Sequence, residues 1–165
     1  MLELYYYENS ICSERALMVL AEKNETDWVP HHVHLFEHEQ FDPEYLKLNP
    51  KAQVPTLVHD GAIIRESSLI ADYLDDLYPT PTLKPTKLSE IARMREWIKE
   101  ADEAGYEGVA SLSFVIIFRA KLMAMSEQDR DAYWVGQTVL ERTQRQQSCV
   151  YDGFDSPYAL RAIAT

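Results

Sequence analysis

The stretch Asn49–Ser68, NPKAQVPTLVHDGAIIRESS, constrains the fold more than any other part of the chain. Pro55 has no N–H, so it belongs at the start or edge of a strand and not in the middle of a central one. Asp60-Gly61 lies between two apolar runs and is a strong β-hairpin signal. Glu66-Ser67-Ser68 then supplies the carboxylate and hydroxyl groups that favour the start of a helix. The stretch therefore predicts a turn, an antiparallel hairpin and a helix N-terminus that favours an anion.

The residues before this stretch predict a β-α-β unit. Leu2–Tyr7 and Trp28–Phe36 alternate in polarity and favour strands. Between them the spacing predicts a helix with Ser13 as N-cap and Asn24 as its stop, and Pro43–Leu48 favours a short helix. The order βαβ, then ββα, predicts an α/β domain over residues 1–78, with a mixed four-stranded sheet and helices on its faces.

A change of composition follows this predicted domain. Tyr78–Lys87, YPTPTLKPTK, holds three prolines and predicts a linker over residues 79–87. Leu88–Met125 then carries one long helical pattern, in which Gly105 and Gly108 indicate a kink or close helix packing. Residues 88–165 are therefore predicted to form an all-α region. A capping box at Ser126 and Asp129 indicates one further helix, and Pro157 indicates the start of another.

The predicted helical region leaves apolar side chains that need partners. Trp97 and the run Ser113–Phe118 are the main examples. Two explanations stay open: the natural protein continues beyond the sequence given, so that this region is incomplete, or the chain forms a homodimer through these residues.

Charge and cysteine content exclude several kinds of partner. The net charge of −11, with 27 acidic and 16 basic residues, disfavours nucleic acid and anionic membrane surfaces. No apolar run approaches the roughly 20 residues that span a bilayer, and the N-terminus has no secretory pattern. The two cysteines, Cys12 and Cys149, lie far apart in sequence and do not form a disulfide framework. This favours a reducing compartment, the cytoplasm, as the location of the protein. His31, His32, His34 and His38 lack a completing ligand set, so we expect no metal.

The motifs NPKAQVPTL, HDG and IRESSLIADYL, in this order, resemble the thioredoxin-like domain of glutathione transferases. The resemblance extends from Leu2 to about Trp97. The loop LYYYENSICSER is similar to that of the zeta class (maleylacetoacetate isomerase-like), and the chain also resembles the bacterial transferases that cleave lignin β-aryl ethers. The fold that the resemblance implies is a thioredoxin-like N-terminal domain followed by an all-α C-terminal domain.

The resemblance also implies a binding site for glutathione as co-substrate. Val54 would pair its backbone with the cysteinyl part, as in strand addition, with Pro55 as a cis residue that exposes this backbone. Glu66 and Ser67 would bind the γ-glutamyl end, where the helix N-terminus favours a carboxylate. Gln40, with Gln53 beside it, would reach the glycyl end.

The catalytic hydroxyl is less narrowly defined by the sequence. The chemistry requires a donor to the glutathione sulfur, which lowers the pKa of the thiol. The candidates for this donor, Ser10, Cys12 and Ser13, lie in one loop, and Ser10 and Ser13 are nearly equally good candidates. Tyr5, Tyr6 and Tyr7 are further candidates on the strand, and Asp102 is an acidic residue that the resemblance places near a partner's glutathione.

We therefore expect a cytoplasmic, homodimeric glutathione transferase whose thiolate attacks a small hydrophobic or aromatic electrophile, as in detoxification. The alternatives are a non-catalytic regulatory dimer of the same fold, a glutathione-dependent isomerase, and a thiol transferase that uses Cys12. The sequence does not identify the electrophile.

Overall fold

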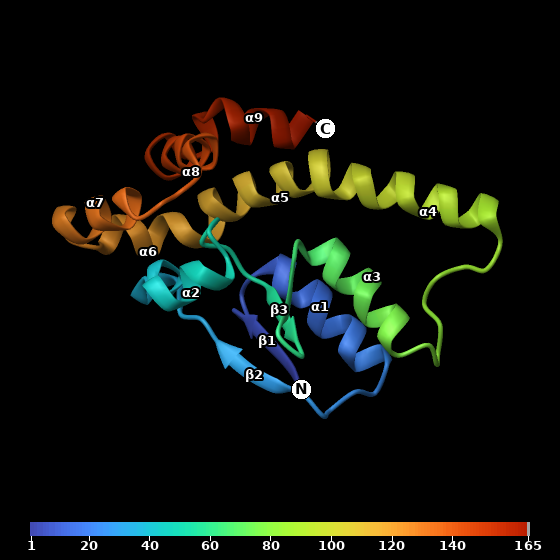
Figure 1. Ribbon diagram of the computed structural model, residues 1–165. Helices are drawn as coiled ribbons and strands as arrows, with labels where there is room; N and C mark the ends of the chain where they lie inside the picture. Colours follow the sequence, from blue (N-terminus) through green and yellow to red (C-terminus); the bar gives the residue numbers. More distant parts are fainter. Residues whose placement is uncertain (165) are drawn as a thin grey trace. The chain divides into compact units, whose positions relative to one another are not determined.

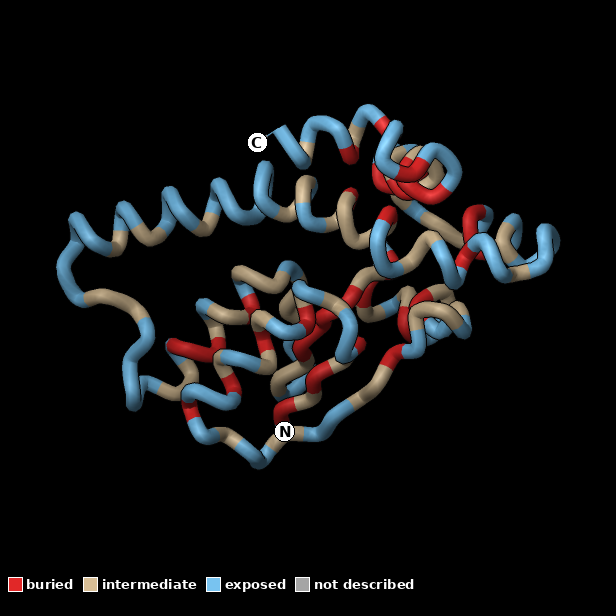
Figure 2. The backbone as a smooth tube through the Cα atoms, turned by 180° about the vertical axis from the view of Figure 1, so that it is seen from behind, coloured by how far each residue is buried: buried red, intermediate tan, exposed pale blue. Residues whose placement is uncertain are grey.

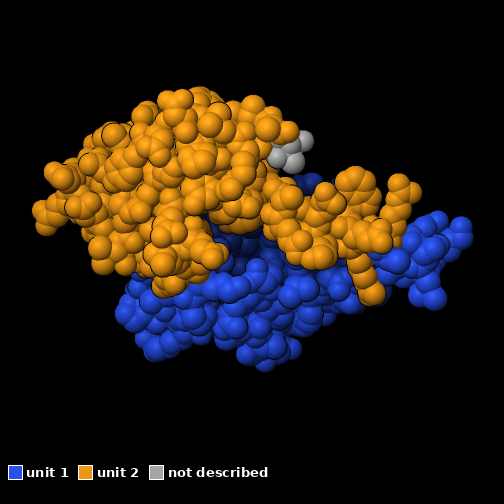
Figure 3. All heavy atoms as spheres, turned by 90° about the horizontal axis from the view of Figure 1, so that it is seen from above, with its two compact units in different colours: residues 1–92 blue, residues 93–165 orange. Residues whose placement is uncertain are grey.

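The structure is a computed structural model that describes residues 1–164. Thr165, the last residue of the predicted helical region, lies outside the described residues. The chain forms two compact units, Met1–Ala92 and the part from Arg93 onward, which Figure 3 shows in two colours. The first unit includes the proline-rich segment that the sequence predicts as a linker.

A four-stranded sheet forms the centre of the first unit (Figure 1). Its strands are β1 (Leu2–Tyr6), β2 (Val29–His32), β3 (Thr56–His59) and β4 (Ala62–Arg65), in the order β2-β1-β3-β4. β1 and β2 are parallel, whereas β1 and β3, and β3 and β4, are antiparallel. The predicted mixed sheet, the hairpin at Asp60-Gly61 and the thioredoxin-like fold class are therefore confirmed.

Helices cover both faces of this sheet. α1 (Ile11–Glu22) and α3 (Ser67–Leu77) lie side by side on one face. Here the buried apolar side chains of the sheet and of both helices pack together: Leu2, Leu4, Ala16, Leu20, Leu57, Ile70 and Leu74. α2 (Pro43–Leu48) belongs to a second cluster, made by Tyr7, Val33, Tyr45 and Val54. Figure 2 colours the buried residues of the strands and helices red.

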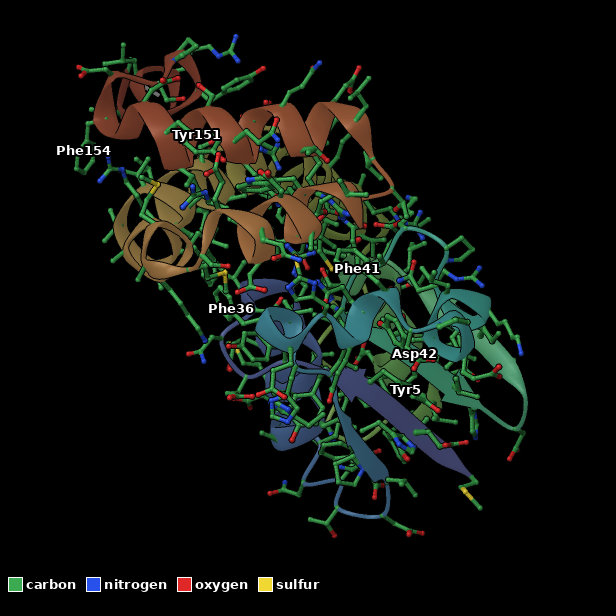
Figure 4. The ribbon with its side chains drawn as sticks, turned by 90° about the vertical axis from the view of Figure 1, so that its left-hand side faces the viewer. Tyr5, Phe36, Phe41, Asp42, Tyr151 and Phe154 are labelled. Carbon is green, nitrogen blue, oxygen red and sulfur yellow. The ribbon has the colours of Figure 1, made fainter. Side chains whose placement is uncertain are left out.

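The second strand is shorter than the predicted Trp28–Phe36. The backbone N–H of Val33 still donates to Tyr6 O at 2.8 Å, but a 3₁₀ turn, Leu35–Glu37, replaces the end of the predicted strand, and a second 3₁₀ turn, Glu39–Phe41, follows it. β2 is an edge strand that contains a proline, so fewer ladder bonds hold it straight. The turns direct Leu35 and Phe36 into the second apolar cluster. Figure 4 labels Phe36 and Phe41 on this segment, together with Asp42, which caps α2 by accepting from the N–H of Glu44 at 2.7 Å.

A buried carboxylate holds the proline-rich segment on the first unit. Asp75 of α3 is 5% exposed and forms an ion pair with Lys23, which is 7% exposed. The same carboxylate accepts from the backbone N–H groups of Leu83 at 2.8 Å and Lys84 at 3.2 Å. Burial alone would raise the pKa of Asp75, but the bonds from Lys23 and Leu83 and the charges of Lys23 and Lys84 lower it overall. One side chain therefore connects the end of α1, helix α3 and the segment that follows.

The second unit is helical, as predicted. Its regular elements begin with α4 (Leu88–Glu100), which starts in the first unit, and continue with α5 (Tyr106–Ser113), α6 (Arg119–Ala124), α7 (Glu127–Val135), α8 (Leu140–Asp152) and α9 (Pro157–Ala164). π-helical turns at Ala101–Gly105 and Phe114–Phe118 join α4, α5 and α6. None of the helices within residues 1–164 is both long and apolar enough to cross a membrane.

The glycine and capping predictions for this unit agree with the structure. An added Cβ at Gly108 would lie 3.7 Å from the Cβ of Ala162, an ordinary van der Waals distance, so α5 and α9 are in contact there. Ser126 caps α7 by accepting from the N–H of Asp129 at 3.1 Å. α8 has no counterpart among the predicted helices, and its buried residues include the polar Arg142, Thr143 and Gln146. Ile116 and Ile117, within the run predicted to need partners, are 63% and 61% exposed.

Gly153, at the end of α8, occupies a backbone conformation that other residues avoid, with φ 64° and ψ −131°. We expect Gly153→Ala to lower the free energy of unfolding by about 1–3 kcal/mol, because a Cβ is strained at this positive φ and would lie 3.4 Å from Nε of Arg119. Urea unfolding followed by circular dichroism measures the change.

Gly105→Ala is the matched control for this prediction. Gly105 is helical, and its added Cβ meets nothing closer than 3.7 Å. The control should be neutral or stabilising by up to about 1 kcal/mol. Equal effects of the two variants would contradict the explanation from φ.

Candidate functional site

The strand register brings three loop segments to one end of the sheet. Tyr5 of β1 pairs with Thr56 of β3, and Thr56 pairs with Arg65 of β4. The loop after β1, the residues before β3 and the start of α3 after β4 therefore all lie at this end. The predicted residues Ser10, Val54 and Ser67 belong to these three segments.

Val54 offers its backbone at this end of the sheet. The Val54–Pro55 peptide bond is cis. Among residues 1–164, no group hydrogen bonds to the N–H or C=O of Val54. Its side chain is 8% exposed and packs in the second apolar cluster. The segment therefore has a fixed side chain and a backbone donor and acceptor that an added extended peptide can use.

Buried polar groups fix the backbone on both sides of Val54-Pro55. The hydroxyl of Tyr45 donates to Gln53 O at 2.6 Å and lies 3.1 Å from Oγ1 of Thr56. Nδ2 of Asn49 donates to the same two oxygens, at 2.9 Å and 3.0 Å. Burial, the largest influence, raises the pKa of Tyr45 to about 12, so the hydroxyl keeps its proton at neutral pH. Gln53 thus contributes its carbonyl group to this network.

The loop after β1 separates the two serine candidates. The N-cap of α1 is Ser10, not Ser13 as predicted, because the helix begins at Ile11. Oγ of Ser10 accepts from the N–H of Ser13 at 3.4 Å, and Ser10 is half-buried. Ser13 has no exposed surface, and its Oγ accepts from the N–H of Tyr7 at 3.2 Å. Ser10 is therefore the serine whose hydroxyl is accessible to a ligand, while Ser13 ties α1 to the end of β1.

The other candidates in this region differ in their accessibility. Cys12, in the first turn of α1, is half-buried and forms no disulfide. Tyr5 stacks on His31 with 4.3 Å between ring centroids, and Tyr6 lies edge-on to Trp28. Tyr7 is buried against Phe36. The three tyrosine rings are thus part of the packing around the sheet.

Glu66 and Ser67 form an uncapped helix start. Glu66 has φ 68° and ψ 118°, and its side chain makes no capping bond to α3. Its carboxylate instead pairs with Nζ of Lys51 at 2.7 Å. The first N–H groups of α3, with the positive end of the helix dipole, can therefore accept a carboxylate, and Glu66 can accept an ammonium group.

Gln40 lies in a different environment from the one that its predicted role requires. It is 3% exposed, and its Nε2 donates to Leu35 O at 3.0 Å. Its Oε1 is buried and has no hydrogen-bond partner among the residues that the structure describes. The side chain closes the loop between β2 and α2, and direct contact with a ligand would require that loop to open.

The histidines near β2 make pairwise contacts with carboxylates. Nε2 of His31 lies 2.8 Å from Glu3, and Nε2 of His32 contacts Glu8. Within residues 1–164, no group of three or more His, Cys, Asp or Glu residues is arranged to hold a metal ion. Asp102, predicted from the resemblance, is exposed in the first π-helical turn of the second unit.

Sequence reasoning missed Tyr45, Asn49, Thr56 and Lys51. Asn49 and Thr56 are polar residues that flank the apolar Val54-Pro55, which is the one signal that could have identified them. Tyr45 and Asn49 bond to Gln53 O and to Thr56, and Lys51 pairs with Glu66; no residue pattern specifies such bonds.

The first unit of the chain matches a known protein family. Residues 4–82 match the family described as "Glutathione S-transferase, N-terminal domain". The chain is 32% identical over 130 residues to Protein LigF of Sphingobium sp., covering 78% of this chain and 50% of LigF. It is 30% identical over 154 residues to a probable maleylacetoacetate isomerase of Caenorhabditis elegans, covering 82% of this chain and 71% of that protein.

A solved structure shares the fold of this chain. The crystal structure of the β-etherase LigF superimposes with a TM-score of 0.86 at 26% identity, over 99% of this chain and 68% of LigF's. Glutathione S-transferase Z1 of Arabidopsis thaliana is 39% identical over 92 residues, which are 55% of this chain and 41% of that protein. The chain thus spans about half the length of the first curated relatives that it matches.

Proposed function

The chain belongs to the glutathione S-transferase superfamily, and from this premise we propose that it binds glutathione and activates its thiolate for attack on a small hydrophobic or aromatic electrophile. The observation that carries the proposal is the meeting of Ser10, the unpaired backbone of Val54 and the uncapped start of α3 at one end of the sheet. The relatives support the ligand, since glutathione appears in the names of several of them.

The cysteinyl and γ-glutamyl parts of glutathione have complementary groups in this arrangement. The cysteinyl N–H would donate to Val54 O, and the cysteinyl carbonyl would accept from Val54 N–H, as one rung of an added strand. The γ-glutamyl carboxylate would bind the N–H groups of Ser67 and Ser68. The ammonium group beside it would pair with Glu66. The contact of Gln40 with the glycyl end stays a prediction: its Nε2 donates to Leu35 O, and its Oε1 has no hydrogen-bond partner among the described residues.

Ser10 would supply the chemistry. Its Oγ already accepts from Ser13 N–H, which leaves its proton to donate to the bound sulfur. A hydrogen bond donated to a thiolate stabilises it and lowers the pKa of the thiol, so the bound thiol would ionise more readily than a free cysteine thiol. The N-terminus of α1 adds a positive partial charge on the same side.

The similarity to LigF favours an aryl ether as one class of electrophile. In such a reaction the thiolate sulfur would attack the carbon that bears the aryloxy group. A C–S bond would form as the C–O bond breaks, and the phenolate would leave with the bonding electron pair and then take up a proton from water. The similarity to maleylacetoacetate isomerases favours an unsaturated dicarbonyl compound as the alternative, with isomerisation as the reaction.

Calorimetric titration with glutathione, followed by turnover assays, tests this proposal. The assays compare three electrophiles: an aryl halide, a β-aryl ether and an unsaturated dicarbonyl compound. We expect binding of glutathione and turnover of at least one of the three. Failure to bind glutathione at millimolar concentration would remove the assignment.

The second candidate function is a binding or regulatory member of the same fold. Binding of glutathione without turnover of any electrophile would favour it. The predicted homodimer stays a prediction, which sedimentation equilibrium checks. The predicted cytoplasmic location and role in detoxification remain predictions as well.

A further inference from the structure

We propose that Asn49 and Tyr45 are positioning residues for ligand binding, which hold the Val54 backbone in the orientation that pairs with a peptide. The inference rests on the proposed function, in which that peptide is glutathione. It assigns a binding role to two side chains that themselves make no contact with the ligand.

The contacts of Asn49 reach both sides of the pairing residue. Its Nδ2 donates to Gln53 O, one residue before Val54, and to Oγ1 of Thr56, two residues after it. Its Oδ1 accepts from Lys51 N–H at 3.1 Å, and its backbone carbonyl accepts from Ala52 N–H at 2.9 Å. One side chain therefore fixes the turn before Val54 and the strand after it.

Tyr45 repeats the two contacts from another element. Its hydroxyl, on α2, reaches the same Gln53 and Thr56 oxygens as Asn49 does. Asn49 is 3% exposed, Tyr45 6% and Thr56 0%, so water does not replace these bonds if one side chain is removed. The carbonyl group of Gln53, with two donors, cannot rotate freely, and neither can Val54 N–H, which belongs to the same planar peptide unit.

The geometry matters because Val54 has no strand partner of its own. The ladder between β1 and β3 ends at Tyr5 and Thr56. Without the Asn49 and Tyr45 side chains, this backbone would keep the packing of the Val54 side chain, the Ala52 N–H bond to Asn49 O and the pairing of Thr56 in β3, but no bond to Gln53 O. A hydrogen bond weakens steeply when its donor or acceptor tilts away from the partner, so loss of either side chain should weaken peptide pairing.

The first measurement is the Kd for glutathione by calorimetry in the wild type, Asn49→Ala and Tyr45→Phe. We expect about a tenfold increase of the Kd in Asn49→Ala and about threefold in Tyr45→Phe, which keeps the Asn49 bonds. At saturating glutathione, kcat should change less than the Kd does. Tyr45→Phe carries the same test if Asn49→Ala does not fold.

A second ligand separates positioning from general destabilisation. This ligand is the depsipeptide analogue of glutathione, in which an ester oxygen replaces the cysteinyl N–H, so the bond to Val54 O cannot form. The wild type should bind it about five- to tenfold more weakly than glutathione. In Asn49→Ala the ratio of the two Kd values should fall toward one, because a misaligned Val54 O already forms a weaker bond to the cysteinyl N–H.

Leu20→Ala is the control, since Leu20 is buried on the opposite face of the sheet. It should lower the melting temperature while the Kd and the ligand ratio stay at the wild-type values. The inference is overturned, and the proposed function is not, if the Kd is unchanged in both Asn49→Ala and Tyr45→Phe. The same holds if Asn49→Ala shows the wild-type ratio of the two Kd values. Absence of glutathione binding by the wild type overturns the proposed function, and this inference with it.

Discussion

Asp75→Ala is expected to lower the free energy of unfolding of the first unit by about 3–5 kcal/mol. The substitution leaves the ammonium group of Lys23 without its carboxylate, although that side chain has no exposed surface. It also removes the acceptor of the Leu83 and Lys84 N–H groups. Urea unfolding followed by circular dichroism measures the loss.

Asp76→Ala is the matched control, one residue further along α3. Its carboxylate also pairs with a lysine, Lys84, but is 70% exposed. Exposed pairs contribute at most about 1 kcal/mol, so the control should change little. If Asp75→Ala cost no more than Asp76→Ala, the buried carboxylate would not be holding the segment.

The same carboxylate predicts a dependence of stability on pH. The pKa of Asp75 is lower in the folded chain than its ordinary value, so the ionised form favours folding. Its contribution is fully present above the unfolded pKa of about 4 and is lost as the pH falls through the lower folded value. Asp75→Ala should therefore be less stable than the wild type at pH 7, and the difference should shrink toward pH 2.

Ser10→Ala is expected to lower kcat for conjugation by about a hundredfold, with the Kd for glutathione changed only a few-fold. The loss would come from the missing donor to the developing thiolate. The pKa of the bound thiol, read from the pH dependence of its ultraviolet absorbance, should rise toward that of a free thiol near 8.5. Ser10→Thr, which keeps a hydroxyl, should retain most of the activity.

Two further variants distinguish the neighbouring candidates. Ser13→Ala should act mainly on stability, because its hydroxyl is buried and bonded to Tyr7 N–H. Cys12→Ala should retain activity. Loss of activity in Cys12→Ala, with Ser10→Ala unaffected, would contradict the serine mechanism and favour a thiol transferase.

Local signals in the sequence were sufficient for most of the first unit. The two apolar runs on either side of the Asp60-Gly61 turn and the helix start at Glu66-Ser67-Ser68 correspond directly to β3, β4 and α3. The predictions are wrong where tertiary contacts determine the local structure. The end of β2 follows the burial of Leu35 and Phe36 and not the alternation of the strand.

The N-cap and the eighth helix illustrate a second limit. Ser10 and Ser13 are equally good capping residues by type, and only the observed start at Ile11 distinguishes them. α8 buries Arg142, Thr143 and Gln146, so its inner face lacks the apolar periodicity by which a helix is normally predicted. The pairing of Lys23 with Asp75, 52 residues apart, has no local signal at all.

The network around Val54 has a thermodynamic consequence for any peptide that binds there. Ordering one residue's backbone costs about 1–2 kcal/mol of conformational entropy. The bonds from Tyr45 and Asn49 mean that Gln53, Val54 and Pro55 lose this entropy when the chain folds. Association then has only the ligand left to order, so more of the interaction energy remains as affinity for a flexible tripeptide.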